Sequence, residues 1–308
     1  MSRMERLQWL SERDAVSRLL AMTPADALID RLSLEDRLEL IDAQLEQLSP
    51  PGPEPARVRL TFNGRPVVGC HGILAEFGVK AVQAFTDAVA AVAASLTAPL
   101  AAMGRIPNRE AHQMLITGTA VGSFGFELEE LPSAQVDWIE TSAVSRALNH
   151  AQELLRGTTA PDDDLLADTA AELDQRAIDK VRHFVSVLRD HDATCALELG
   201  NSVFRFRDSA EVQSSLDRLS RENLQEEVVE IHGRFEGLLP RRRTFEFRRT
   251  DNNEVLTGKL AAAIQQPERV NDHLGEPIVI RLTRTVVGRG RPRFVVHALP
   301  DSWFGEAT

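Results

Sequence analysis

The order of short alternating segments in the last quarter of the chain constrains the fold most strongly. Between Glu226 and Leu299, apolar and polar side chains alternate in five runs, which is the pattern of half-buried strands. The third and fourth runs are separated by Ala261–Leu274, for which the sequence predicts a helix interrupted at Pro267. The expected order is therefore three strands, a helix and two strands.

This order is that of an OB-fold, a small five-stranded Greek-key barrel. The chain is therefore predicted to end in an OB-like β-barrel over residues 225–308. The residues on the apolar side of the five runs are expected to form its core, and they are Val229, Ile231, Phe245, Phe247, Ile278, Ile280, Leu282 and Phe294.

Arginines gather in the two turns that flank the ligand groove of an OB-fold. Arginine suits phosphate because its planar guanidinium donates two parallel hydrogen bonds and keeps its charge. The segment 289–293, Arg-Gly-Arg-Pro-Arg, also resembles the core of an AT-hook, which binds the minor groove of DNA. We predict that DNA or RNA binds the barrel through Arg241, Arg242, Arg243, Arg248, Arg289, Arg291 and Arg293.

Charge supports a second interpretation of the same arginines. The chain carries a net charge of −11. Residues 225–308 hold 13 basic and 12 acidic side chains, a net charge of +1, which leaves −12 for residues 1–224. An acidic body repels nucleic acid, and the arginines could instead pair with acidic groups of a partner or of the chain's own N-terminal part. A scaffold subunit of a multiprotein complex is the alternative function.

The N-terminal segment, residues 1–49, is predicted to be helical. Leu34, Leu38, Ile41, Leu45 and Leu48 recur at spacings of four and three, which would place them on one side of a helix. A helical hairpin that packs within its own domain is the favoured interpretation. Self-association, or contact with a protein partner through these helices, is the alternative. The proline-rich segment 49–53 is typical of a stiff linker.

Residues 57–222 are predicted to form an α+β domain. Three hairpins are expected, over Val58–Val68 with Asn63-Gly64 as its turn, over Met114–Leu128, and over Ala196–Phe206. Helical segments separate them, including one at about Leu74–Ala98. The predicted fold class is thus α+β, a helix-rich N-terminal domain with antiparallel hairpins followed by an OB-like barrel.

Several polar groupings in the sequence match no catalytic or metal site. Gly118, Gly122 and Gly125 match no phosphate-binding loop. Asp162–Asp164 is explained by the acidic first turn of a helix, where the helix dipole favours carboxylates. The spacing of His183, His191, Asp192 and Cys195 matches no zinc site. The sequence therefore predicts no metal site and no cofactor.

Catalysis is not expected either, because no nucleophile elbow, metalloprotease motif or P-loop is present. The enzyme alternative is a metal-dependent nuclease with scattered carboxylates, for which Asp251, Glu254 and Lys259 are the nearest grouping. Two cysteines and no secretory signal favour the cytoplasm. The uncharged stretch 88–104 is too short and too polar to span a membrane. The predicted function is a non-enzymatic cytoplasmic accessory protein that contacts nucleic acid.

Overall fold

The computed structural model describes residues 3–24, 26–47, 55–101, 103–120, 124–131 and 141–303. It contains 43% helix and 29% strand, and a closed five-stranded barrel lies at the C-terminal end, so the predicted mixed architecture with a C-terminal β-barrel is confirmed. The chain divides into two compact units, Met1–Pro55 with Leu131–Ser142 and Ala56–Glu130 with Ala143–Thr308. The finer boundaries 1–49, 57–222 and 225–308 stay a prediction, as does a separate helix-rich N-terminal domain.

The first unit is built on two helices, α1 (Arg3–Met22) and α2 (Leu28–Gln47), which pack against each other. Val16 and Ile41 are the buried apolar side chains among those described in these helices. Among the described side chains, Arg13 pairs with Asp42 at 2.6 Å and Arg37 pairs with Glu12 across the two helices.

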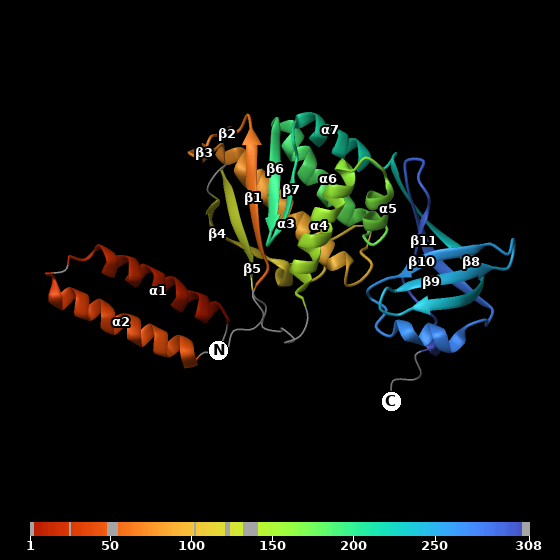
Figure 1. The fold of residues 1–308 in the computed structure, drawn as a ribbon, viewed down its shortest axis with the longest axis horizontal. Helices are drawn as coiled ribbons and strands as arrows, with labels where there is room; N and C mark the ends of the chain where they lie inside the picture. Colours follow the sequence, from red (N-terminus) through yellow and green to blue (C-terminus); the bar gives the residue numbers. More distant parts are fainter. Residues whose placement is uncertain are drawn as a thin grey trace. The chain divides into compact units, whose positions relative to one another are not determined.

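The second unit begins with an antiparallel sheet of five strands in the order β4-β5-β1-β6-β7 (Figure 1). Its strands are β1 (Arg57–Gly64), β4 (Met114–Ala120), β5 (Gly125–Glu130), β6 (Ala193–Leu199) and β7 (Ser202–Arg205). The expected hairpins β4–β5 and β6–β7 are both present. The central strand β1 pairs with β5 on one side and with β6 on the other.

The predicted hairpin at Asn63-Gly64 is wrong. Strand β1 stays paired with β6 as far as Gly64 opposite Ala193, and Arg65 N–H then donates to Asp192 O. The short strand β2 (Val67–Val68) pairs with β3 (Gly72–Ile73), and not with β1. Gly64 therefore has its positive φ at the point where the chain leaves a central strand, and not in a two-residue turn.

Helices cover one face of this sheet (Figure 1). They are α3 (Ala75–Ser95), α4 (Ala143–Thr159), α5 (Asp164–Ala170), α6 (Gln175–Asp190) and α7 (Ser209–Arg218), with a short 3-10 helix at Arg109–His112. By length and composition α3 could cross a membrane, but 67% of its apolar window is buried. Most of the apolar surface of this helix is therefore covered by protein.

The C-terminal barrel has the strand order β10-β12-β11-β8-β9 and closes on itself. Its elements are β8 (Leu224–Leu239), β9 (Thr244–Arg249), β10 (Val255–Leu260), the 3-10 helix η2 (Pro267–His273), β11 (Ile278–Val287), β12 (Arg293–Val296) and a last 3-10 turn at Asp301–Trp303. All neighbouring strands are antiparallel except β10 and β12, which are parallel.

The helix predicted over Ala261–Leu274 is shorter than expected. Pro267 begins η2 instead of interrupting a longer helix, since proline lacks the N–H that the first helical position leaves unpaired.

The predicted barrel core is found largely where it was expected. Phe245, Phe247, Ile280 and Leu282 are buried, and Val229, Ile231, Ile278 and Phe294 pack partly buried against them. Phe235 is the centre of this core, with ring contacts to Phe245, Phe247 and Trp303.

The barrel and the helical layer share two strands. β8 and β11 pair over ten residues, from Gly233 opposite Ile278 to Leu224 opposite Val287. The barrel end of this ribbon contributes Ile280 and Leu282 to the barrel core, whereas Leu224 and Val287 belong to the core under the sheet. One continuous ribbon thus enters both hydrophobic cores.

Two glycines of β8 allow a matched test of the barrel packing. A Cβ at Gly233 would lie 2.1 Å from Arg248 O and 2.4 Å from a ring carbon of Phe247, whereas a Cβ at Gly237 would meet nothing within 4 Å. We expect Gly233→Ala to lower the free energy of unfolding by about 3 kcal/mol through overpacking. Gly237→Ala should change it by less than about 1 kcal/mol. Urea denaturation measures both, and equal midpoints would contradict the close approach at Gly233.

Candidate nucleic-acid interface

Arg243 is one of the seven predicted arginines, and it supports the barrel itself. Its backbone has a positive φ of 54° in the turn between β8 and β9. Its guanidinium donates to the carbonyl oxygens of Leu260, Ala261 and Ile264, and its burial lowers the pKa of the side chain. These bonds satisfy the carbonyls at the end of β10, so the Arg243 side chain is committed to the fold.

Arg248 and Arg293 are paired with carboxylates of the same chain. Arg248 forms a bidentate pair with Glu236 on the neighbouring strand, at 2.5 and 2.8 Å. Arg293, at the start of β12, binds Asp168 at 2.5 Å and Asp164 at 2.9 Å, both on helix α5. The positive charge of these two side chains is largely compensated.

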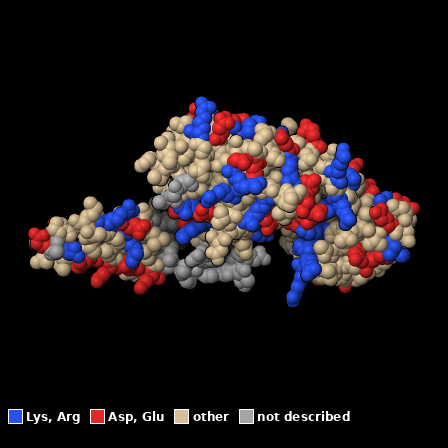
Figure 2. Space-filling model, turned by 45° about the horizontal axis from the view of Figure 1, so that its top comes forward, with Lys and Arg blue, Asp and Glu red and all other residues tan. Residues whose placement is uncertain are grey.

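The other four predicted arginines, Arg241, Arg242, Arg289 and Arg291, are exposed at the tips of two barrel loops. Within the part of the chain that the structure describes, no carboxylate lies within ion-pair distance of them. Basic and acidic side chains are interspersed over the face drawn in Figure 2. Any contact with a polyanion therefore depends on local loop arginines and not on a broad basic field.

The two loops lie at opposite ends of the parallel strand pair β10–β12. The first adjoins the C-terminal end of β10, since Leu260 N–H donates to Arg243 O. The second precedes β12, whose Val295 lies opposite Lys259. Four residues of strand span about 13 Å, the length of about four phosphates along one strand of a duplex. This separation suits two contacts with one nucleic-acid backbone.

A cleft with a volume of about 140 Å³ lies where the barrel faces the helical layer. Lys259 on its barrel side binds Glu172, and the other carboxylate oxygen of Glu172 lies 3.8 Å from His150 Nε2. Burial lowers the pKa of His297 in its wall. The charges of the cleft are thus mostly compensated internally, and Arg242 at its border is exposed.

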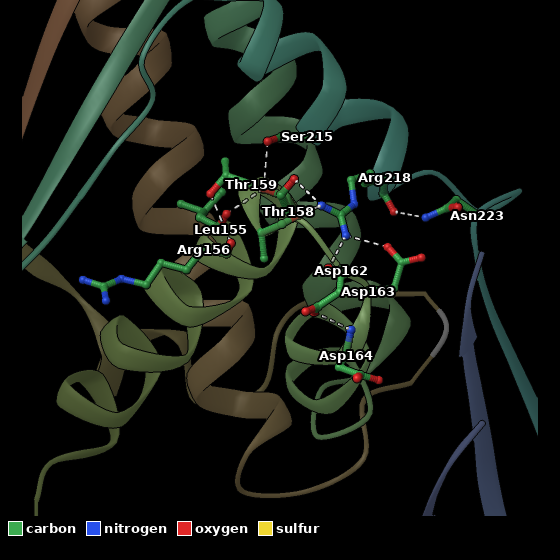
Figure 3. Close-up of polar contacts among 11 residues, drawn as sticks. Leu155, Arg156, Thr158, Thr159, Asp162, Asp163, Asp164, Ser215, Arg218 and Asn223 are labelled. Atoms are coloured by element: carbon green, nitrogen blue, oxygen red, sulfur yellow. Dashed lines mark hydrogen bonds and ion pairs between the residues drawn. The ribbon is translucent and has the colours of Figure 1, made fainter. Parts of the chain in front are cut away.

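Arg218 holds the acidic helix α5 in place (Figure 3). Its guanidinium donates to the carbonyl oxygens of Thr158, Ala160 and Asp162, and it binds Asp163 Oδ1 at 2.5 Å. The buried Thr158 hydroxyl bonds to Ser215, one turn before Arg218 on α7. One side chain of α7 therefore fixes the whole connection between α4 and α5.

The same network reaches the second arginine loop. Asn223 donates to Arg218 O (Figure 3). Asn223 O in turn accepts from Gly288 N–H. A Cβ at Gly288 would lie 3.1 Å from Asp163 Oδ2. The loop then turns back through a bond from Gly290 N–H to Val287 O, so residues 287–290 form a tight turn at the start of the loop.

A substitution at Arg218 tests this network. Arg218→Met should lower the free energy of unfolding by about 2 kcal/mol, because it leaves part-buried carbonyls and Asp163 without their donor. Arg221→Met is the matched control, because Arg221 is exposed and forms a single ion pair with Asp179, worth less than about 1 kcal/mol. Thermal or urea unfolding compares the two variants, and equal losses would contradict a supporting role for Arg218.

The residues considered for catalysis or metal binding do not come together in the described part of the structure. Asp251 and Glu254 both pair with Arg249, while Lys259 binds Glu172, so these three residues do not converge. Among the described residues no group of three or more metal-ligating side chains is found. Gly122 lies outside the described residues.

The histidine and cysteine grouping is dispersed. His191 packs on Phe77 and bonds to Val187 O, whereas Cys195 is fully buried in β6, where desolvation raises the pKa of its thiol. Gly118 lies at an irregularity in β4, and Gly125 permits the close approach of β5 to Leu60 O. His191, Cys195, Gly118 and Gly125 are therefore each explained by their place in the fold.

The sequence did not identify the acidic side chains that form ion pairs with Lys259 and Arg293 of the barrel. Asp164 and Asp168 on α5 and Glu172 after it lie more than 85 residues from the basic groups that they bind. The run Asp162–Asp164 was visible as a charged segment, but no local pattern indicates its partner. Comparisons with protein-family models, with curated proteins and with solved structures found no match to this chain.

Proposed function

We propose that this protein is a non-enzymatic accessory protein whose C-terminal barrel is OB-like and contacts nucleic acid. The strand order supports the OB-like identity. The first barrel strand pairs with the second and the fourth, the third pairs in parallel with the fifth, and a short helix connects the third to the fourth. In OB-folds the first and last loops border the ligand site, and in this barrel they are the two arginine loops.

The observation that carries the proposal is the exposure of Arg241, Arg242, Arg289 and Arg291 on these loops. A guanidinium that has no carboxylate beside it keeps its full capacity to bind a phosphate. The strand face between the loops is occupied near Lys259 by Glu172. Contact is therefore confined to the loops, and the phosphate backbone is recognised in preference to the bases.

The salt dependence of binding tests this proposal. Four phosphate contacts give a slope of log K against log salt of about −3.6 on duplex DNA and about −2.8 on a single strand. Arg242→Ala and Arg291→Ala should each make the slope less negative by about one unit, similarly for all sequences. Anisotropy titrations at several salt concentrations measure the slopes.

Arg281→Ala is the matched control, because it removes an exposed arginine from β11 outside the two loops. It should leave the slope unchanged. Arg243→Ala should destabilise the barrel without a specific change of slope, since its side chain bonds to carbonyl groups. A wild-type protein without salt-dependent binding to any single-stranded or duplex nucleic acid would refute the proposal.

The acidic partners of Arg293 provide a test in the opposite direction. Asp164→Asn combined with Asp168→Asn frees the Arg293 guanidinium beside the second loop. We expect tighter nucleic-acid binding and a slope more negative by about one unit. Asp217→Asn with Asp272→Asn removes the same charge from exposed positions elsewhere and should change the slope much less. Equal effects of the two double variants would mean that net charge alone governs binding.

The alternative function is a scaffold subunit whose arginines bind acidic protein surfaces. One observation favours it, namely that Arg293 and Lys259 already pair with carboxylates of the helical layer. If nucleic-acid binding is absent while Arg242→Ala and Arg291→Ala abolish capture of an acidic polypeptide such as polyglutamate, the scaffold interpretation replaces the first.

A further inference from the structure

The N-terminal helical hairpin carries an unusual amount of exposed apolar surface. Nineteen large apolar side chains are exposed among the described residues, and seven of them lie in α1 and α2. Ile29 is 85% exposed and Met22 is 81% exposed. The seven residues are Leu10, Leu19, Met22, Leu28, Ile29, Leu32 and Leu40.

Helix α2 has apolar side chains on two opposite sides. Leu34, Leu38 and Leu45 are half-buried and Ile41 is fully buried, on the side that faces α1. At 3.6 residues per turn, the exposed group Leu28, Ile29, Leu32 and Leu40 falls within a sector of about 120° on the opposite side. A helix that is apolar on two sides requires a cover on both.

The described part of the hairpin has a small core. Among the described side chains of the two 20-residue helices, Val16 and Ile41 are the buried apolar ones. Isolated helices of this length are marginal in water, and most helical stability in proteins comes from packing of an apolar face. The exposed side of α2 is therefore a surface that gains stability when another helix covers it.

The charges of the two helices indicate what that helix is. From the sequence, α1 holds four arginines and three acidic residues, a net charge of +1, whereas α2 holds two arginines and six acidic residues, a net charge of −4. Two α2 helices in contact would repel each other, while α1 offers the opposite sign together with exposed Leu19 and Met22. The best complement that this chain contains for the outer side of α2 is α1 of another molecule.

We propose that the α1–α2 hairpin is a homodimerisation element in which the outer side of α2 packs against the hairpin of a second copy. A two-fold axis makes both copies contribute the same surface to this contact. The proline-rich sequence 49–53 is of a type expected for a stiff linker, which suits such an element.

Sedimentation velocity and light scattering on the full chain test the proposal. The wild type should have twice the mass of the 34.1 kDa chain at micromolar concentration. Ile29→Gln combined with Leu32→Gln removes four apolar side chains from the dimer and leaves its charge unchanged. The dissociation constant should rise by at least about 1000-fold, because each lost apolar contact weakens association by an order of magnitude or more.

Val203→Gln with Val279→Gln is the matched control, because both valines are about half exposed on strands of the second unit. This double variant should remain a dimer. A wild-type protein that is monomeric at 100 µM would overturn the proposal, as would a dimer that Ile29→Gln/Leu32→Gln leaves intact.

Hydrogen exchange of the wild type provides an independent measurement if the double variant unfolds the hairpin. In a dimer, amide exchange in α1 and α2 slows as protein concentration rises, because association protects the helices. Exchange that does not change with concentration, in a protein that sediments as a monomer over the same range, would refute the proposal.

Discussion

The pairing of β8 with β11 is the interaction on which the second unit depends. β8 is the first strand of the barrel and β11 is the fourth. Their ten-residue register extends to Leu224 and Val287, which lie in the core under the sheet. A register shift of one residue would turn every side chain of the ribbon to the opposite side. Two hydrophobic cores are therefore specified by one set of backbone hydrogen bonds.

This ribbon also decides the environment of the arginines. It ends where the loop between β11 and β12 begins, beside the N-terminal end of α5, and Arg218 and Asn223 hold that junction through backbone carbonyls. Arg293 is thereby brought to Asp164 and Asp168. Residues of one type thus have three roles, namely support of the backbone at Arg243, internal ion pairing at Arg248 and Arg293, and exposure to solvent at the loop tips.

The two proposals together describe a protein that binds a polyanion weakly through its arginine loops and carries these loops twice in a dimer. Four exposed arginines give modest affinity for a polyanion, and the acidic body reduces it further. Dimerisation through the N-terminal hairpin would present the loops twice on one particle. Two linked sites bind one long ligand more tightly than either does alone, because the second contact forms at a high effective concentration.

The sequence by itself determined the order of the barrel's elements along the chain and most of its core, because alternation with a period of two is a local property that reports which side of a strand is buried. It also determined the extent of α3, whose long apolar run ends before Pro99. The predictions at Asn63-Gly64 and Pro267 were wrong. A turn-forming pair can also end a central strand, and a proline can also begin a helix.

Only the tertiary structure decided which arginines remain exposed. Arg241, Arg242 and Arg243 are identical neighbours in sequence, yet Arg243 bonds to three carbonyl oxygens while Arg241 and Arg242 face solvent. Arg293 meets carboxylates 125 and 129 residues away. The charge state of a binding surface depends on such long-range pairs, and Coulomb interactions follow distance in space, which no local pattern in the chain contains.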